Sequence, residues 1–123
     1  MTELGFWRIA AADPDRVVLV DPDHAEHAAG ELLAATNQVV HGLRALGVGK
    51  GDVISMLLPN CAEFLEVLLA IQQAGFYVVP INYHLVGPEI AYIINDSESK
   101  AFIAHERFAG EALRAAAEID VPA

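Results

Sequence analysis

The sequence is short of cysteine and of basic residues, and each shortage excludes a class of protein. Cys61 is the single cysteine among 123 residues, so no disulfide can form within the chain and a reducing, cytoplasmic setting is expected. Seven lysines and arginines stand against 17 aspartates and glutamates, which gives a formal net charge of -10. A chain this acidic repels phosphate backbones and anionic lipid headgroups, so nucleic acid and membrane surfaces are not expected as partners.

The sequence also lacks a long apolar run that would direct it to a membrane. Residues 1–16 contain acidic and basic side chains and no continuous apolar stretch, so they do not form a signal peptide. Residues 67–88 contain no charged side chain, but Gln, Gly, Pro and Asn interrupt them. We therefore expect a buried helix, a turn and a strand in this segment, and no membrane span.

What the chain does contain is an alternation of strand and helix patterns between Gly47 and Ile119. A glycine-rich turn leads into the apolar run Val53–Leu58, and a mostly apolar helix then reaches about Ala74. The second strand follows at Phe76–Pro80. Strand, helix and strand at this spacing predict a right-handed crossover in a parallel sheet.

Local signals bound the remaining elements. Asn60 is expected to cap the helix that ends near Ala74, and Pro88 suits the first turn of the next helix. That helix carries Ile90, Ile93 and Ile94 on one face. A third strand at Lys100–Ala104 and a last helix marked by Phe108, Ala112, Ala116 and Ile119 complete this part.

The first half of the chain has weaker signals. We expect a helix over Thr2–Ala12 with Leu4, Phe6, Trp7 and Ala11 inward, a strand at Arg16–Val20, a turn at Asp21–Asp23 and no clear period up to Ala29. Glu31–Leu46 has helical spacing and ends at Gly47. The prediction is one partial α/β domain over residues 1–123: a helix and hairpin at about 1–30, then a β-α unit at about 47–119. The sheet is largely parallel and flanked by helices in three layers.

Two segments suggest ligand sites, and both have simpler explanations. The run Gly47–Gly51 contains three glycines and Lys50, but it follows a helix and opens a strand, whereas a phosphate loop follows a strand and opens a helix. A chain-reversing turn is therefore expected. The second segment supplies metal-type ligands within seven positions: Asp21, Asp23, His24, Glu26 and His27. Their spacing fits no recognised metal site, so a solvated hairpin tip is the better interpretation and no bound metal is expected.

Other reactive side chains give no catalytic pattern. Cys61 is interpreted as a small residue in the first helical turn, where nearby Glu63 disfavours a thiolate. His41, His84 and His105 are isolated in sequence and are expected on the surface or as satisfied core histidines. No serine lies in a nucleophile elbow. We therefore assign no catalytic, cofactor-binding or metal-binding residue.

Several ordered pieces of the sequence do resemble a known family. They are Gly47–Val53, Leu58-Pro59-Asn60 with Glu63-Phe64, Gln73-Ala74-Gly75, Val79-Pro80-Ile81-Asn82, Glu89-Ile90-Ala91-Tyr92 and Asp96–Lys100. Together with Pro14-Asp15-Arg16 and the helix before Gly47, they are similar to the N-terminal region of adenylate-forming enzymes. Pro80-Ile81-Asn82 resembles the acyl-CoA synthetase branch. One departure is Ala28–Leu32, where the family usually has a hydroxyl residue and an aromatic residue before a small residue, a glutamate and a leucine. The missing hydroxyl removes a helix N-cap worth about 1 kcal/mol.

The resemblance implies an acyl-CoA ligase that joins a carboxylate to coenzyme A through an acyl-adenylate, releasing AMP and pyrophosphate. The family uses Mg, ATP and coenzyme A, and its lysine-bearing loop, acidic ribose-binding residue and C-terminal lysine match nothing in this sequence. The chain is thus expected to be an incomplete, inactive N-terminal subdomain with the rest of the enzyme as its partner. The alternative is a stand-alone α/β binding or assembly module. The wide apolar arc of the Cys61–Ala74 helix also predicts a homodimer of the isolated chain.

Overall fold

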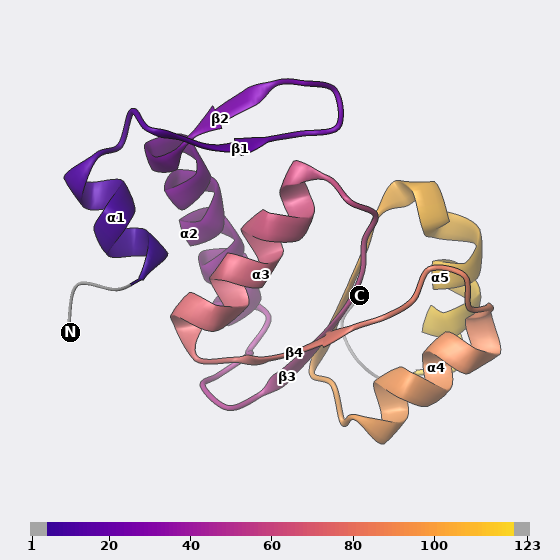
Figure 1. Cartoon of the computed structure of the whole chain (residues 1–123). Helices are drawn as coiled ribbons and strands as arrows, with labels where there is room; N and C mark the ends of the chain where they lie inside the picture. The colour runs from indigo at the N-terminus through magenta and orange to yellow at the C-terminus, as the bar shows by residue number, and fades with distance from the viewer. Residues whose placement is uncertain (1–4, 120–123) are drawn as a thin grey trace.

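Five α-helices and five strands make up residues 5–119, the part of the chain that the computed structural model describes (Figure 1). The helices are α1 (Phe6–Ala12), α2 (Ala29–Ala45), α3 (Ala62–Ala74), α4 (Gly87–Asp96) and α5 (Ala109–Ala116), with a 3₁₀ turn, η1 (Glu106–Phe108), before α5. The strands are β1 (Val17–Val20), β2 (Glu26–Ala28), β3 (Val53–Leu57), β4 (Tyr77–Pro80) and β5 (Ala101–Ala104). The predicted order of elements from Gly47 onward is confirmed.

A three-stranded parallel sheet forms the centre of the fold. Its strand order is β4-β3-β5, with Ile54 of β3 paired to Val78 on one side and to Ala101 on the other. Helices α2 and α3 lie on one face and α4 and α5 on the other (Figure 1). The predicted α/β class and the parallel sheet between helical layers are therefore confirmed.

Each face of the sheet has its own hydrophobic core. Val67 and Ile71 of α3 pack with Ile54 and other residues on one face, whereas Ile90 and Phe102 belong to the cluster on the other. Ile54, Ile71 and Ile90 are each 0% exposed. Burial of one such side chain contributes about 1.5–3 kcal/mol, so the two clusters hold the layers together.

The hairpin and the start of α2 are joined through backbone atoms. Strands β1 and β2 pair antiparallel and form a hairpin. Ala28 occupies the N-cap position of α2 without a side-chain hydrogen bond, as expected from the missing hydroxyl. The N–H groups of Ala29 and Gly30 instead donate to the carbonyls of Arg16 and Pro14, both at 2.8 Å. The turn just before β1 thereby satisfies donors that a capping side chain would otherwise take.

Two predictions about helix positions are wrong. Trp7 is 44% exposed and Ala11 is exposed, while Ala10 is the buried residue of α1 at 1%. Nearly every position of this short helix is apolar, so its sequence does not select one inward face. Phe6 is half-buried, and Leu4 lies outside the described residues.

Asn60 does not cap α3, which is the second error. The helix begins at Ala62, Cys61 is its N-cap residue, and no side chain accepts a capping hydrogen bond. The N–H of Phe64 donates to the Cys61 carbonyl at 3.2 Å, so backbone bonding closes the first turn. Asn60 is exposed one residue earlier, at the end of the loop from β3.

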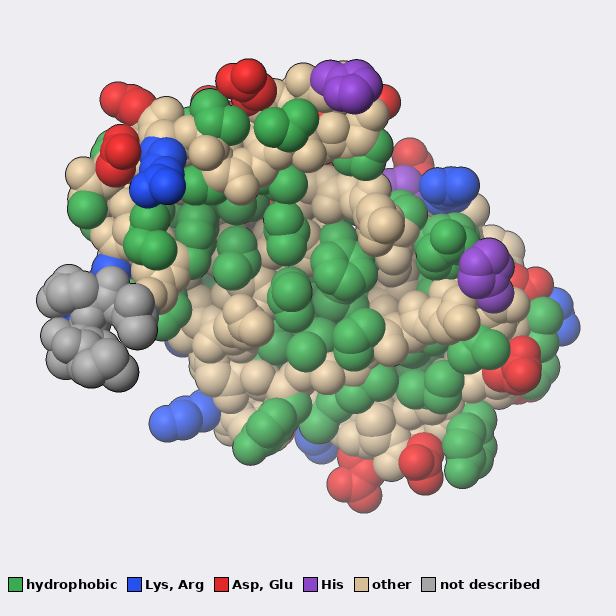
Figure 2. Space-filling view, in the orientation of Figure 1, with side chains coloured by type: hydrophobic (Ala, Val, Ile, Leu, Met, Phe, Trp, Pro, Cys, Tyr) green, Lys and Arg blue, Asp and Glu red, His purple; other side chains and the backbone are tan. Residues whose placement is uncertain are grey.

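Helix α3 is less completely covered than its sequence suggests. Val67 and Ile71 are buried, but Leu65, Leu68 and Leu69 are only half-buried, so the expected cover on both sides is incomplete. Hydrophobic side chains gather on the face formed by α3 and β4 (Figure 2). Within residues 5–119, no helix combines the length and the apolar character needed to cross a bilayer.

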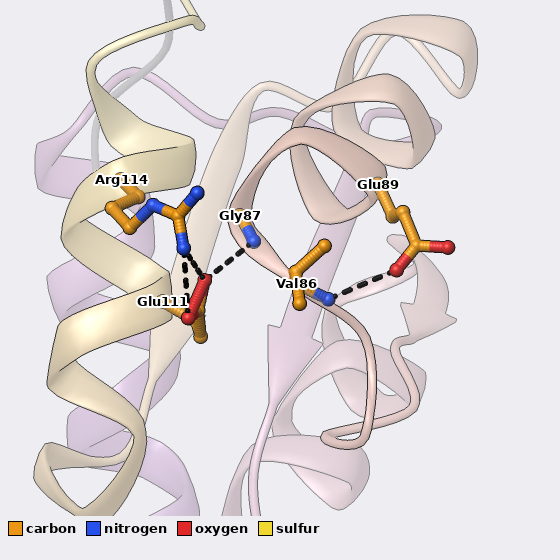
Figure 3. Close-up of polar contacts among 5 residues, drawn as sticks. All are labelled: Val86, Gly87, Glu89, Glu111 and Arg114. Atoms are coloured by element: carbon orange, nitrogen blue, oxygen red, sulfur yellow. Dashed lines mark hydrogen bonds and ion pairs between the residues drawn. The ribbon is translucent and has the colours of Figure 1, made fainter.

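Helices α4 and α5 meet at the first residue of α4. The Glu111 carboxylate accepts the Gly87 N–H at 2.8 Å and also accepts hydrogen bonds from Arg114 at 2.8 and 3.1 Å (Figure 3). On the other side of this turn, Glu89 accepts the Val86 N–H at 3.1 Å. Two carboxylates therefore lie at the positive end of the α4 dipole, which stabilises this helix start.

Candidate functional site

The carboxyl ends of the three parallel strands form the candidate site. The chain leaves β3 toward α3 on one face of the sheet, whereas it leaves β4 and β5 toward α4 and α5 on the other (Figure 1). In open α/β sheets, ligands bind in the crevice where successive connections separate in this way. The segments at this edge are Leu58–Cys61, Ile81–His84 and His105–Phe108.

A cavity of about 350 Å³, here called the carboxyl-edge cavity, lies between the hairpin and this edge. Asp21, Asp23 and His27 line it from the hairpin. The loop after β3 and the first turns of α3 contribute Pro59, Asn60, Cys61, Ala62, Glu63 and Glu66, and the segment after β5 contributes His105 and Arg107. An adjoining apolar cavity of about 400 Å³ lies between Leu19 and Val20 of β1 and Phe64 and Leu65 of α3.

Asp21 organises the hairpin tip. Its Oδ1 accepts the N–H groups of Asp23 at 2.9 Å and Ala25 at 3.0 Å, and its Oδ2 lies 2.8 Å from Nε2 of His27. The hydrogen bond with His27 lowers the pKa of the Asp21 carboxyl, and the same bond raises the pKa of His27. The two groups therefore form an ion pair when the imidazole is protonated.

The suspected metal ligands are only partly brought together. Among the five candidate ligands, the side chains of Asp21 and His27 contact each other directly. Asp23 lines the carboxyl-edge cavity with them. His24 has a positive φ of 66° at the exposed turn. Residues 5–119 contain no group of three or more side chains placed to hold a metal ion. The absence of a bound metal stays a prediction.

Cys61 and Glu66 lie in surroundings that disfavour their charged forms. Burial raises the pKa of the Cys61 thiol, and Glu63 contributes in the same direction. Burial also raises the pKa of Glu66, with a further contribution from the Glu63 carboxylate. A protonated thiol is a poor nucleophile, so the geometry does not favour covalent catalysis by Cys61.

The Gly47–Gly51 segment is a turn between α2 and β3, as predicted. The Asp52 carboxylate accepts the Gly49 N–H at 2.8 Å, and the Gly51 N–H donates to the Gly75 carbonyl at 2.9 Å. These donors are used within the protein. A phosphate group would have to replace their present acceptors, and the negative charge of the neighbouring Asp52 would repel it.

A cluster of aromatic residues joins the loops after β4 and β5. The Tyr83 and Phe108 rings stack with centroids 4.9 Å apart and planes within 9°. The ring centroids of His84 and Tyr83 lie 4.4 Å apart, and the Arg107 guanidinium carbon lies 5.7 Å from the centroid of the Phe108 ring. Sequence reasoning missed this cluster because Tyr83 and Phe108 are far apart in the chain, although each follows a predicted strand.

The isolated histidines have surface positions, as expected. His41 and His84 are exposed, and His105 is half-buried. The His105 Nδ1 accepts the Arg107 N–H at 3.0 Å and thereby caps η1. None of the three approaches another described group in an arrangement typical of catalysis.

Comparison with known proteins gives consistent matches. Residues 6–122 match the sequence profile of a family described as AMP-binding enzyme. A long-chain-fatty-acid–CoA ligase of Mycobacterium tuberculosis is 38% identical over 73 residues, which make up 59% of this chain and 14% of that ligase. The matched part of the chain therefore spans about a seventh of the length of this relative.

Solved structures extend the similarity to nearly the whole chain. A fatty acyl CoA synthetase from Mycobacterium tuberculosis matches with a TM-score of 0.85 and 30% identity, over 95% of this chain and 24% of that one. The N-terminal domain of FACL13 from the same organism gives a TM-score of 0.85 and 30% identity, over 95% of this chain and 30% of that domain. The three-layer arrangement described above is thus shared with these proteins.

Proposed function

This chain belongs to the AMP-binding enzyme family, and we propose that it forms part of the N-terminal scaffold of an ATP-dependent acyl-CoA ligase. The observation that carries the proposal is the match to fatty acyl CoA synthetase structure over 95% of the chain. The proposed reaction converts a carboxylate, ATP and coenzyme A into acyl-CoA, AMP and pyrophosphate. The proposed location is the cytoplasm, in keeping with the one free thiol, Cys61.

The described residues do not fit Mg-ATP. Four carboxylates, Asp21, Asp23, Glu63 and Glu66, line the carboxyl-edge cavity against a single arginine, Arg107. Adenylation brings two anions together and needs a preorganised positive environment. We therefore derive no adenylation step from these residues. The proposed role of the chain is to position the rest of a ligase, and the chain by itself is inactive in this proposal.

A chimeric ligase tests the scaffold role. Residues 6–119 of this chain would replace the structurally equivalent segment of the Mycobacterium tuberculosis fatty acyl CoA synthetase, whose structure matches 95% of this chain. We expect the chimera to form the CoA thioester of a long-chain fatty acid in an ATP-dependent way. The control carries the ligase's own segment between the same junctions. A chimera that folds like the control but forms no thioester would contradict the proposal and favour a stand-alone binding module.

The isolated chain tests the second part of the proposal. Carboxylate-dependent release of pyrophosphate from ATP is measured with the purified 123-residue chain and compared with a no-protein blank. We expect no difference between the two. Release above the blank would show that this chain contains an adenylation site, and the assignment of a scaffold role would then fail.

A further inference from the structure

Histidines supply the only basic side chains in two long segments of the sequence. Residues 17–43, which form the hairpin and most of α2, contain four acidic side chains but no lysine or arginine. Residues 51–99, which include α3, also contain no lysine or arginine. Histidine gains and loses its proton near neutral pH, so the positive charge that these segments can carry depends on pH.

His27 lies where these two segments meet, at the carboxyl-edge cavity between the hairpin and α3. Its Nε2 is 2.8 Å from Oδ2 of Asp21, a contact within the hairpin itself. The carboxylates of Glu31 in α2 and Glu66 in α3 also favour a proton on this imidazole. The His27 side chain is 28% exposed, so water screens these attractions less than on an open surface. A protonated His27 is therefore attracted to three parts of the fold.

The other charged groups around His27 do not reverse this preference. Besides Asp21, Glu66 and His27 itself, the charged or titratable side chains that line the cavity are Asp23, Cys61, Glu63, His105 and Arg107. Arg107 opposes a proton on His27, but its guanidinium lies against the Phe108 ring, 5.7 Å from the ring centroid. The hydrogen bond with Asp21 and the charges of Glu31 and Glu66 raise the pKa of His27 despite its partial burial.

The hairpin tip, residues 21–25, is held by the same Asp21. The Asp21 N–H donates to the Ala25 carbonyl at 3.0 Å, and its Oδ1 accepts the N–H groups of Asp23 and Ala25. His24 in the tip has a φ of 66°, a left-handed conformation that costs energy in residues other than glycine. Residues 22–25 are exposed, so the Asp21 bonds, rather than packing, fix the tip. The conformation of the tip thus depends on the position of one carboxylate.

We propose that the proton on His27 controls the mobility of the hairpin tip. With the imidazole protonated, the charge-assisted bond to Asp21 fixes the carboxylate that holds the tip. The neutral imidazole can still donate one hydrogen bond, but it loses the attraction between full charges, so the tip becomes mobile as pH rises and the proton leaves. Because Asp21, Asp23 and His27 line the carboxyl-edge cavity, this proton also determines how firmly one wall of the cavity is held.

NMR relaxation of the Ala25 methyl group tests the proposal. An alanine methyl is attached directly to the backbone, and its signal is not lost to amide exchange at high pH. We expect its order parameter to fall from about 0.85 at about pH 5 to about 0.6 at about pH 9, with the midpoint of the His27 imidazole resonances. Ala45, exposed at the end of α2, is the internal reference and should not change. An unchanged Ala25, or a midpoint different from that of His27, overturns the proposal.

Three substitutions separate the proton from the side chain that carries it. His27→Gln keeps a polar group without a charge, so Ala25 should be mobile at both pH values. His27→Lys carries a positive charge at both pH values, so Ala25 should stay ordered in each. The control is His24→Asn, which removes an exposed histidine of the same tip, suits the left-handed conformation and should keep the pH response.

The outcomes of these variants are decisive in either direction. A His27→Gln variant that keeps the pH response, or a His24→Asn variant that loses it, overturns the proposal. If His27→Gln fails to fold, as judged by circular dichroism, His27→Lys still tests the charge. A His27→Lys variant whose Ala25 becomes as mobile at about pH 9 as in the wild type overturns the proposal as well.

Discussion

Gly87 occupies the tightest contact between α4 and α5, and replacing it with alanine tests how closely these helices must pack. A Cβ at this position would lie 2.6 Å from the Arg114 Cβ and 3.3 Å from the Ala115 nitrogen. Carbon atoms normally approach to about 3.5–4.0 Å. The Arg114 Cβ is fixed by the backbone and cannot rotate away, so α5 has to move outward as a whole.

The expected cost follows from three contributions. Overpacking typically destabilises by about 1–3 kcal/mol. An outward shift also weakens the 2.8 Å hydrogen bond from the Gly87 N–H to Glu111, which we take as about 1 kcal/mol because the Glu111 side chain is 37% exposed. Alanine offsets about 0.4–1 kcal/mol by restricting the unfolded chain. The net destabilisation is about 2 kcal/mol, which lowers Tm by roughly 8 °C.

Thermal unfolding followed by circular dichroism measures this effect, with Gly42→Ala as the control. Gly42 also lies within a helix, α2, but a Cβ there meets nothing within 4 Å. Relief of the glycine entropy cost should stabilise that variant by about 0.5–1 kcal/mol. If Gly87→Ala unfolds at or above the temperature of Gly42→Ala, the close approach of α4 and α5 does not limit stability and the reasoning is refuted.

Three further predictions concern the hairpin and the sheet. His27 should titrate above the ordinary value of 6.5 in an NMR pH series, and Asp21→Asn should lower its pKa; an unchanged value would show that Asp21 is not the cause. Because the pKa is raised on folding, the ion pair contributes its full stability below the unfolded pKa and loses it as pH rises through the folded one. Ser99→Ala should cost more in urea unfolding than Ser55→Ala. Ser99 bonds both Ser55, at 2.5 Å, and Ser97, at 2.7 Å, so its loss leaves the fully buried Ser55 hydroxyl without this partner at about 1–3 kcal/mol; equal costs would contradict this. Elemental analysis of the purified chain should find no stoichiometric metal, and zinc or nickel that disappears in the His24→Ala, His27→Ala variant would prove the hairpin-tip interpretation wrong.

The parts of the fold that were predictable from sequence are those with a local chemical cause. Gly47 and Gly75 have φ values of 90° and 78°, a conformation that glycine adopts without strain, and they mark the ends of α2 and α3. Pro88 lies in the first turn of α4, where its missing N–H leaves no donor unsatisfied. The turn at Gly47–Gly51 was also predictable, because this segment follows a helix and opens a strand.

The features that escaped prediction depend on contacts between distant residues. Ser55 and Ser99 are 44 positions apart, and nothing near either residue shows that their hydroxyls meet inside the sheet. Strand β2 has only three residues, so its pairing with β1, rather than its own period, defines it. The carboxyl-edge cavity likewise combines the hairpin with segments after β3 and β5, and its acidic balance emerges only once these are folded together.

The strand order also determines when each neighbour of β3 becomes available during synthesis on the ribosome. The central strand β3 ends at Leu57, while β4 begins 20 residues later (77 − 57) and β5 begins 44 residues later (101 − 57). At a synthesis rate of about 5–20 residues per second, β5 is therefore made roughly 2–9 seconds after β3. During that interval β3, the most buried strand of the folded protein, lacks one of its two neighbouring strands. A chaperone that binds short apolar segments would be expected to bind β3 at this stage.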